Sequence, residues 1–231
     1  MMATLPLFTQ YLQHPTIGNR TVGVIYFDGM CLLDLIGAVE MFNGARSVFG
    51  KLVYIGEKAG QVFKSVESMN VVSDVGFDDA PHVDVLIIPG GPGVHDVSEN
   101  ETYLAFVKMC SSQAERVLSI CTGCCILVKA GLLDGLKATT NKISFNQIRR
   151  LGPKTKWVEK ARWVDDGKFT TSSGVTAGMD AALHVVESIT NNRSLAEEIA
   201  SVIEYEWNQD PDNDPFSKFI GCIPEELLKK Y

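Results

Sequence analysis

The chain has 231 residues, an apolar share of 45% and a formal net charge of −7. This length allows one large α/β domain or two small ones, and the composition is typical of globular proteins and far from that of a disordered chain. The negative charge and the lack of a Lys/Arg-rich run argue against nucleic acid and anionic membranes as partners, because both require a concentrated basic face.

Export and membrane insertion are also not expected. Apolar runs such as 83–89 are too short to span a bilayer, and the N-terminus lacks the basic and apolar regions of a secretory signal. The six cysteines are Cys31, Cys110, Cys121, Cys124, Cys125 and Cys222. In a large chain without a signal, reduced thiols are favoured over disulfides. We therefore expect a cytoplasmic protein.

The first half of the chain begins with a turn-rich stretch, residues 1–20, which we interpret as an N-terminal extension. Apolar and β-branched patterning then predicts a strand at 21–27, a helix at 33–48, a strand at 52–55, a hairpin within 62–75 and a strand at 83–88. The last of these, VDVLII, is followed at once by the sharp loop Pro89-Gly90-Gly91-Pro92-Gly93.

The second half continues the alternation. The predicted elements are a helix at 101–113, strand 117–120, helix 124–133, strand 138–140, helix 144–151, strand 169–172 and helices 176–190 and 195–207. An acidic, Pro-containing C-terminal tail, NQDPDNDPF, precedes a short closing helix. No linker or internal repeat divides residues 21–231, so we expect a single domain there.

Alternating strands and helices predict an α/β fold with a mostly parallel sheet covered by helices on both faces. Ligands of such sheets bind beyond the carboxyl ends of the strands. Three loops are expected at that edge: Gly90-Gly91, Cys121-Thr122-Gly123 and Ser173-Gly174.

Cys121 carries the strongest chemical signal. It stands between a buried strand and a helix, where local N–H groups and the helix dipole favour a thiolate and lower the thiol pKa. The turn has the mechanics of a nucleophile elbow. Gly123 permits close backbone approach, and the Thr122 and Gly91 amides are candidates to stabilise a developing negative charge. The residues alone leave open that Cys121 is a buried structural cysteine.

Asp34 is the second candidate. At the start of the 33–48 helix it is either an N-cap, or an acid/base partner of Cys121 or a residue that positions a water molecule. Cys121-Thr122-Gly123-Cys124 is also a lone C-x-x-C, a weak zinc or redox signal. His14, His82, His95 and His184 are not adjacent to Cys121, so no Cys–His dyad is evident.

Together these residues resemble the DJ-1/PfpI superfamily. The matching pieces are FDGMCLLDLIGAVEMF, VDVLIIPGGPGV, VLSICTGCCILVKAGLLDGLKATT and FTTSSGVTAGMDAAL. The resemblance covers about residues 21–190 and implies a flavodoxin-like three-layer sandwich, a homodimer and a reactive cysteine at position 121.

Within that superfamily, the LDL-x-G and C-T-G combination resembles isocyanide hydratases, which add water to an isocyanide and give an N-substituted formamide. By that resemblance, Cys121 attacks the isocyanide carbon to form a thioimidate and Asp34 assists proton transfer. Substrate binding falls to Gly90, Gly91, Thr122, Gly123 and Ser173. A small-molecule substrate is implied, with no metal and no organic cofactor.

Two departures from the family pattern stand out. Protease and glyoxalase-like branches place His directly after the cysteine, where this chain has Thr122. Hydratase-like members carry T-T-H-W after the elbow helix, where this chain has Thr139-Thr140-Asn141-Lys142. A third branch fuses the domain to a helix-turn-helix regulator, and the end of this chain at Tyr231 leads us to expect no such module. Two alternatives stay open: a redox-responsive, chaperone-like dimer with an oxidisable Cys121, and a glyoxalase-type enzyme acting on methylglyoxal.

Overall fold

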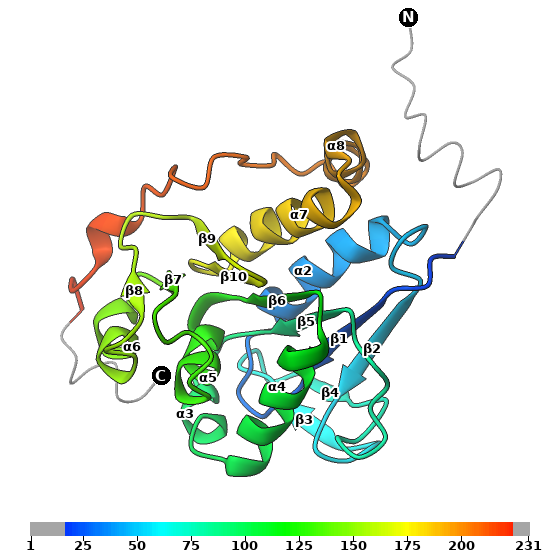
Figure 1. The fold of residues 1–231 in the computed structure, drawn as a ribbon, viewed down its shortest axis with the longest axis horizontal. Helices are drawn as coiled ribbons and strands as arrows, with labels where there is room; N and C mark the ends of the chain where they lie inside the picture. Colours follow the sequence, from blue (N-terminus) through cyan, green and yellow to red (C-terminus); the bar gives the residue numbers. More distant parts are fainter. Residues whose placement is uncertain (1–16, 224–231) are drawn as a thin grey trace, which may run out of the picture.

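The computed structural model describes residues 17–223 and places a six-stranded sheet at the centre of the molecule (Figure 1). The strand order is β2-β1-β5-β6-β10-β9, and all neighbours are parallel except β9, which is antiparallel to β10. The strands are β1 (Thr21–Ile25), β2 (Lys51–Ile55), β5 (Val85–Ile88), β6 (Arg116–Ser119), β9 (Trp163–Asp166) and β10 (Phe169–Ser172).

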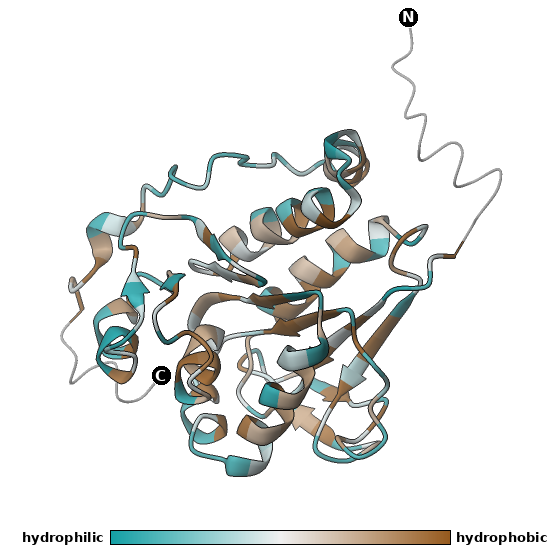
Figure 2. Ribbon diagram, in the orientation of Figure 1, coloured by the Kyte–Doolittle hydropathy of each residue, from teal (hydrophilic) through white to brown (hydrophobic). Residues whose placement is uncertain are grey.

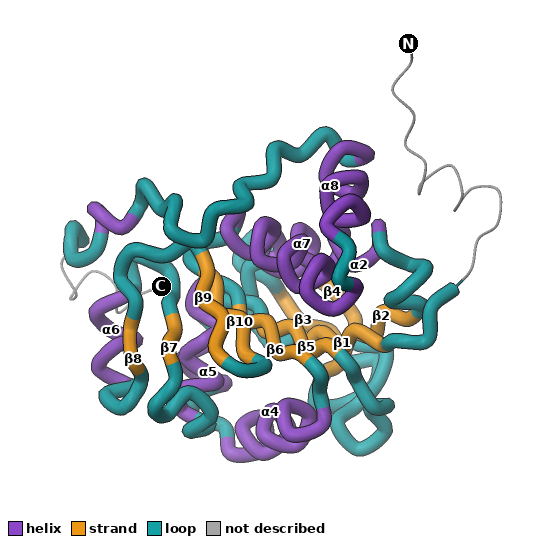
Figure 3. The backbone as a smooth tube through the Cα atoms, turned by 45° about the horizontal axis from the view of Figure 1, so that its top comes forward, coloured by secondary structure: helices purple, strands orange, loops and turns teal. Residues whose placement is uncertain are grey.

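Helices cover both faces of this sheet (Figures 1 and 3). One face carries α2 (Leu32–Gly44), α7 (Thr176–Thr190) and α8 (Arg193–Val202), and the other carries α3 (Val94–Val97), α4 (Glu101–Gln113) and α5 (Cys124–Lys129). The predicted three-layer α/β sandwich with a mostly parallel sheet is confirmed.

Smaller elements surround the sandwich. A hairpin is formed by β3 (Val62–Lys64) and β4 (Asn70–Val72), and a parallel ribbon by β7 (Lys137–Ala138) and β8 (Lys156–Trp157), beside α6 (Phe145–Leu151). Two short 3₁₀ turns are η1 (Cys121–Gly123) and η2 (Ser217–Phe219). Within the described part of the chain, no helix combines the length and apolar character needed to span a bilayer.

The core follows from the apolar strands, which form the brown centre of Figure 2. All four residues of β5 are buried, as expected for a strand covered on both faces. Two glycines let helices approach closely. A Cβ at Gly37 of α2 would lie 2.8 Å from the Met179 side chain of α7, and one at Gly178 would lie 2.4 Å from Ile120 after β6.

Most predicted elements are present, with differences at the ends. The 33–48 helix ends at Gly44, and the Ala45 carbonyl then accepts the amides of Val48 and Phe49. The 124–133 helix ends early, at Lys129 of α5, and the 195–207 helix ends at Val202. Strand β9 and the β7–β8 pairing were not predicted. Residues 1–16 of the expected extension and 224–231 of the closing region lie outside the described residues, so the domain division stays a prediction.

The tail after α8 crosses the top of the molecule to reach β9 and the β7–β8 ribbon (Figure 1). It is fastened first at Asp180 of α7, which accepts hydrogen bonds from Tyr205 Oη at 2.8 Å and the Asn208 amide at 3.0 Å. Farther along, Arg162 donates its backbone N–H to the Pro211 carbonyl at 2.6 Å.

The third contact that holds the tail is a buried ion pair. Lys142 Nζ lies 3.1 Å from Asp214 Oδ2, and the two side chains are 3% and 0% exposed. Nζ directs its hydrogen bonds to Thr139 Oγ1 at 2.7 Å and the Ala161 carbonyl at 2.8 Å, while Asp214 Oδ2 has no directed hydrogen-bond donor among the described residues. The contact is an ion pair between two buried side chains. Burial lowers the pKa of Lys142, and Asp214 opposes that effect.

Removing Asp214 leaves a buried ammonium without its counter-charge. We expect Asp214→Ala to lower the free energy of unfolding by about 3–5 kcal/mol, as for other broken buried pairs. Urea unfolding followed by circular dichroism measures this loss. The control is Asp212→Ala, an exposed change in the same tail, which should stay within about 0.5 kcal/mol. Equal effects of the two changes would contradict a specific role for the Lys142–Asp214 pair.

Candidate active site

Cys121 lies where the carboxyl ends of β5, β6 and β10 meet. Its φ of 57° is in the left-handed region, which non-glycine residues rarely adopt. Three hydrogen bonds hold this backbone: the Cys121 amide donates to the Ser173 carbonyl at 3.0 Å, and the Cys121 carbonyl accepts from Thr140 Oγ1 at 2.8 Å and the Asn141 amide at 3.4 Å. The predicted tight turn at Cys121 is confirmed, and the loops that follow β7 and β10 fix the backbone from which the Cys121 side chain projects.

Two glycines are required by the packing of this turn. A Cβ at Gly123 would stand 2.4 Å from the Ile88 carbonyl oxygen, so η1 can approach the end of β5 only without a side chain. A Cβ at Gly90 would stand 2.7 Å from the Thr122 amide and 2.9 Å from Asp34 Oδ2. Both positions were predicted to be near the substrate, and at both the surrounding backbone leaves no room for a side chain.

Asp34 is brought to Cys121 by α2. It is not the N-cap, which is Cys31, but a buried residue of the first turn that is 1% exposed. Its Oδ2 accepts the Gly90 amide at 2.8 Å, while Oδ1 has no directed hydrogen bond from the described residues. The thiols of Cys31 and Cys121 flank this carboxyl group, and hydrogen bonding to them opposes the rise in its pKa.

Burial raises the pKa of Asp34 from 3.8 to about 6. The carboxyl group is therefore half-protonated near pH 6 and about one-tenth protonated at pH 7, so both forms are populated and it can give and take a proton. The sequence left open whether Asp34 was a cap or a partner of Cys121, and the structure places it beside the thiol.

The expected depression of the Cys121 pKa is not found. Burial raises the pKa of the thiol well above its usual range, and the negative charge of Asp34 raises it further. Hydrogen bonds from the Thr122 amide and the Asn141 side chain act in the opposite direction. The helix that follows this cysteine is short, because α5 has only six residues and begins after a 3₁₀ turn. Cys121 is 8% exposed, so water stabilises its thiolate poorly.

The other predicted site residues surround the elbow in different ways. Gly91, with φ of 126°, donates its amide to Thr122 Oγ1 at 2.9 Å, so this amide is engaged with a side chain. Ser173 holds the elbow through its carbonyl and donates its own amide to the Arg162 carbonyl at 2.8 Å. Their assignment to substrate binding stays a prediction.

Three residues near the site were missed by reasoning from the sequence. Cys31 precedes α2, and its thiol contacts Glu67 Oε1 at 3.5 Å. Glu67, in the β3–β4 turn, accepts the Leu32 amide at 3.1 Å and so caps α2 from a distant loop. Asn141 was noted only as a departure from a family pattern, and it contacts Cys121. Only Asn141 had a signal in the sequence, namely that departure.

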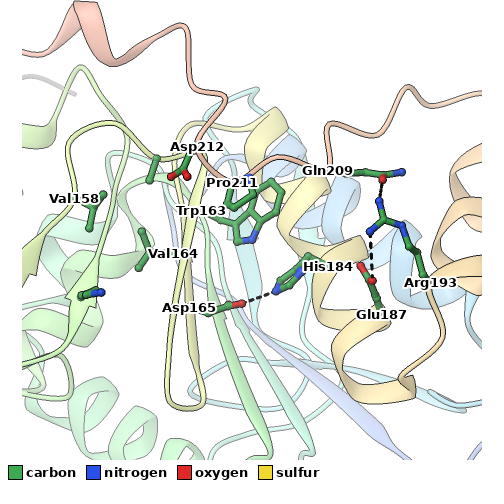
Figure 4. Close-up of a pocket in the computed structure, with 12 residues that line it drawn as sticks. Val158, Trp163, Val164, Asp165, His184, Glu187, Arg193, Gln209, Pro211 and Asp212 are labelled. Atoms are coloured by element: carbon green, nitrogen blue, oxygen red, sulfur yellow. Dashed lines mark hydrogen bonds and ion pairs between the residues drawn. The ribbon is translucent and has the colours of Figure 1, made fainter.

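The remaining candidates lie elsewhere. Cys124 is fully buried against Thr140, and its thiol and that of Cys121 are both free. His95 is exposed on α3. His184 of α7 is hydrogen-bonded to Asp165 of β9 at the edge of a hollow of about 520 Å³ beneath the tail (Figure 4). None of the residues predicted for the Cys121 site lines that hollow.

Comparison with known proteins decides the family. The sequence profile of the DJ-1/PfpI family matches residues 20–188. The chain belongs to the DJ-1/PfpI family. It is 33% identical over 168 residues to an isonitrile hydratase of Pseudomonas putida, an alignment covering 73% of this chain and 71% of the hydratase.

Other DJ-1/PfpI relatives carry different names. The HTH-type transcriptional regulator GbdR of Pseudomonas aeruginosa is 28% identical over 90% of this chain, which spans only 58% of the regulator's length. Deglycase TK1284 of Thermococcus kodakarensis is 34% identical over 43% of this chain and 59% of the deglycase. The family thus includes enzymes and regulators, and membership alone does not define an activity.

Solved structures agree with the fold. A ThiJ/PfpI family protein from Pseudomonas syringae superimposes with a TM-score of 0.77 at 25% identity, covering 100% of this chain and 92% of that one. DJ-1beta of Drosophila melanogaster gives 0.70 at 20% identity over 82% of this chain and all of its own.

The raised pKa of Asp34 makes stability depend on pH. The folded state binds more protons than the unfolded chain between pH 3.8 and about 6. The contribution of Asp34 to stability is therefore complete below pH 3.8 and is lost as the pH rises through about 6. We expect Asp34→Asn to gain on the order of 2 kcal/mol relative to wild type between about pH 4.5 and 7.5.

Urea unfolding of wild type and Asp34→Asn at the two pH values measures this gain. Subtracting the free energies of unfolding of the two proteins at each pH removes the contribution of the other carboxyl groups, which both proteins share. A difference that does not change with pH would mean that the pKa of Asp34 is not raised.

Proposed function

We propose that this chain is a cysteine-dependent isocyanide hydratase, converting R–N≡C and water into an N-substituted formamide. The observation that supports this most is the buried Asp34 carboxyl group beside Cys121, with a pKa of about 6 and with one oxygen unengaged by the described residues. The similarity to an isonitrile hydratase at 33% identity points the same way.

The first half of the proposed reaction forms a thioimidate. The Cys121 thiol gives its proton to Asp34 as sulfur bonds to the terminal isocyanide carbon. Asp34 returns that proton to the same carbon, giving Cys–S–CH=N–R. This sequence needs one group that accepts and then donates a proton, and a carboxyl group with a pKa near neutrality is suited to it.

The second half consumes water. A water oxygen bonds to the thioimidate carbon while Asp34 takes a proton from the water and gives one to nitrogen. The carbon–sulfur bond then breaks, the hydroxyl proton returns through Asp34 to sulfur, and the formamide R–NH–CHO leaves. Atoms balance as one isocyanide plus one water, with no oxidant or reductant.

Burial of the sulfur also bears on the substrate. At 8% exposure, Cys121 is accessible only to a slender group. An isocyanide is linear at its reacting end and places a bare carbon atom at the tip, so it can reach the sulfur without bulk on either side.

We expect the wild-type protein to form an N-substituted formamide from a simple aryl isocyanide. Cys121→Ala should abolish turnover, since it removes the sulfur that bonds to carbon. Asp34→Asn should lower kcat about 10²–10⁴-fold, the usual effect of losing a general acid or base. Loss of the isocyanide infrared band and chromatography of the formamide measure the reaction.

The matched control is Cys110→Ala, a buried cysteine of α4 away from the site, which should keep full turnover. Formation of formamide no faster than in buffer would refute the hydratase proposal. Lactate formed from methylglyoxal, lost in Cys121→Ala, would instead identify a glyoxalase-type enzyme, and peroxide modification without turnover a redox-responsive protein.

We also propose that the protein is a homodimer formed through an apolar surface at the lip of this site. Leu33 and Ile36 of α2 are exposed by 50% and 52%, and Val66 and Met69 of the β3–β4 turn by 50% and 58%. The turn is attached to the start of α2 by the hydrogen bond from the Val66 amide to the Met30 carbonyl at 3.0 Å, which holds it beside the helix that carries Leu33 and Ile36.

A charged residue at the centre of a dimer interface is costly to bury. We expect wild type to sediment as a dimer, and Leu33→Lys and Met69→Lys to sediment as monomers at the same concentration. Leu151→Lys, an exposed apolar residue of α6, is the control and should remain dimeric. A wild-type monomer at tens of micromolar would contradict the dimer proposal.

A further inference from the structure

The loop after β7 brings Asn141 against the nucleophile. Thr140 Oγ1 and the Asn141 amide both donate to the carbonyl of Cys121, at 2.8 and 3.4 Å. Segment 139–142 therefore packs on the backbone of the elbow, and these hydrogen bonds fix the position of residue 141 relative to Cys121.

The orientation of the Asn141 amide follows from its own contacts. Oδ1 accepts the backbone amides of Ile143 at 3.0 Å and Ser144 at 3.2 Å. A flip of the side-chain amide would place an N–H group against two N–H groups and lose both bonds. Oδ1 is therefore fixed toward the start of α6, and Nδ2 is fixed on the opposite side.

Nδ2 faces the 173–174 loop, which contacts the elbow on the side opposite to segment 139–142. A Cβ at Gly174 would lie 3.1 Å from Asn141 Nδ2. The preceding residue, Ser173, accepts the Cys121 amide. Nδ2 thus lies beside the 173–174 loop that holds the elbow, on the side of the amide away from α6. A hydrogen bond from the Asn141 side chain is among the influences that lower the pKa of the Cys121 thiol.

We propose that Asn141 is a second catalytic residue of this site, whose Nδ2–H group donates a hydrogen bond to Sγ of Cys121 and stabilises the thiolate. The proposal deepens the hydratase reaction and rests on Cys121 as its nucleophile. In a Cys–His dyad, one histidine both accepts the thiol proton and stabilises the thiolate. Here Asp34 accepts and donates the proton, and Asn141 stabilises the thiolate through a hydrogen bond without accepting a proton.

This division matters at two points of the proposed reaction. When the thiol proton moves to Asp34, negative charge develops on a sulfur that burial has removed from water. When the carbon–sulfur bond breaks, the same charge develops on the leaving sulfur. A neutral amide donor lowers the energy of both states and, unlike histidine, keeps the same charge at every pH. The titratable groups that act on this thiol are Asp34 and Cys31.

The decisive change is Asn141→Asp, which keeps the size and the Oδ1 acceptor but replaces the N–H donor with an oxygen. The thiol pKa of Cys121 should rise by about one unit or more, because a hydrogen bond to a charged group is lost and a like charge is added. Asn141→Ala, which adds no charge, should shift the pKa in the same direction by less. Asn141→His, which restores a donor, should bring the thiol pKa back to wild type or below.

The thiol pKa is read from the pH dependence of alkylation by iodoacetamide, quantified at Cys121 by mass spectrometry. This readout needs no isocyanide turnover. Asn146→Asp, the same substitution on α6 away from the thiol, should leave the Cys121 pKa unchanged. If Asn141→Asp does not fold, as judged by circular dichroism, the comparison of Asn141→Ala with Asn141→His answers the same question.

An unchanged Cys121 pKa in Asn141→Asp and Asn141→Ala would overturn the assignment of Asn141, whatever the substrate. A shifted pKa in a protein whose wild type does not hydrate isocyanides would uphold Asn141 and refute the proposed function. If both hold, kcat for isocyanide hydration should fall at least tenfold in Asn141→Asp and recover in Asn141→His.

Discussion

The strained backbone of Cys121 is the constraint on which the rest of the site depends. A non-glycine residue in the left-handed region costs on the order of 1 kcal/mol or more, and it persists only where its surroundings over-determine it. Here a carbonyl after β10, a hydroxyl and an amide after β7 all bond to the one residue. Gly123 lets this turn lie on the end of β5. Loops distant in sequence therefore converge because the elbow requires support from each of them.

The same convergence sets the electrostatics. Holding Cys121 so firmly removes it from water, and burial then disfavours charge on both the thiol and the Asp34 carboxyl group. Two neighbouring acids that each resist ionisation do not form a permanent thiolate, in contrast to a Cys–His ion pair. Such a site holds its sulfur in the neutral form at rest, and charge appears there only while a substrate accepts it.

Much of the fold could be predicted because its signals are local. The continuous apolar run of β5 and the strand-to-turn change at Ile120 and Cys121 need no knowledge of the rest of the chain. Strand β9 was missed because WVDD has only two apolar residues, although the Asp166-Gly167 pair after it, with φ of 61° at Gly167, is a turn signal. The C-terminal boundary of α8 was missed because the apolar pattern continues into Tyr205 and Trp207, which bond to Asp180 from outside any helix.

The candidate site divides in the same way. Cys121, Asp34 and the Gly90 loop could be placed from strand ends and from family motifs. The direction of the thiol pKa could not, because it depends on how completely α2 and the loops cover the sulfur. Nor could the roles of Asn141 and Lys142, since each is defined by a partner from elsewhere in the chain: Cys121 for the first and Asp214 for the second.

The Lys142–Asp214 pair has a consequence for the order in which this fold opens. Segments without helix or strand usually fray at little cost, independently of the core. This tail cannot fray independently, because releasing Asp214 leaves the buried Lys142 ammonium without its counter-charge. Lys142 directly follows Asn141 and lies two residues after Thr140, whose hydroxyl donates to the Cys121 carbonyl. Tail and elbow therefore form one cooperative unit, in which an irregular segment near the C-terminus has the persistence of the core and contributes rigidity to the loop that faces the nucleophile.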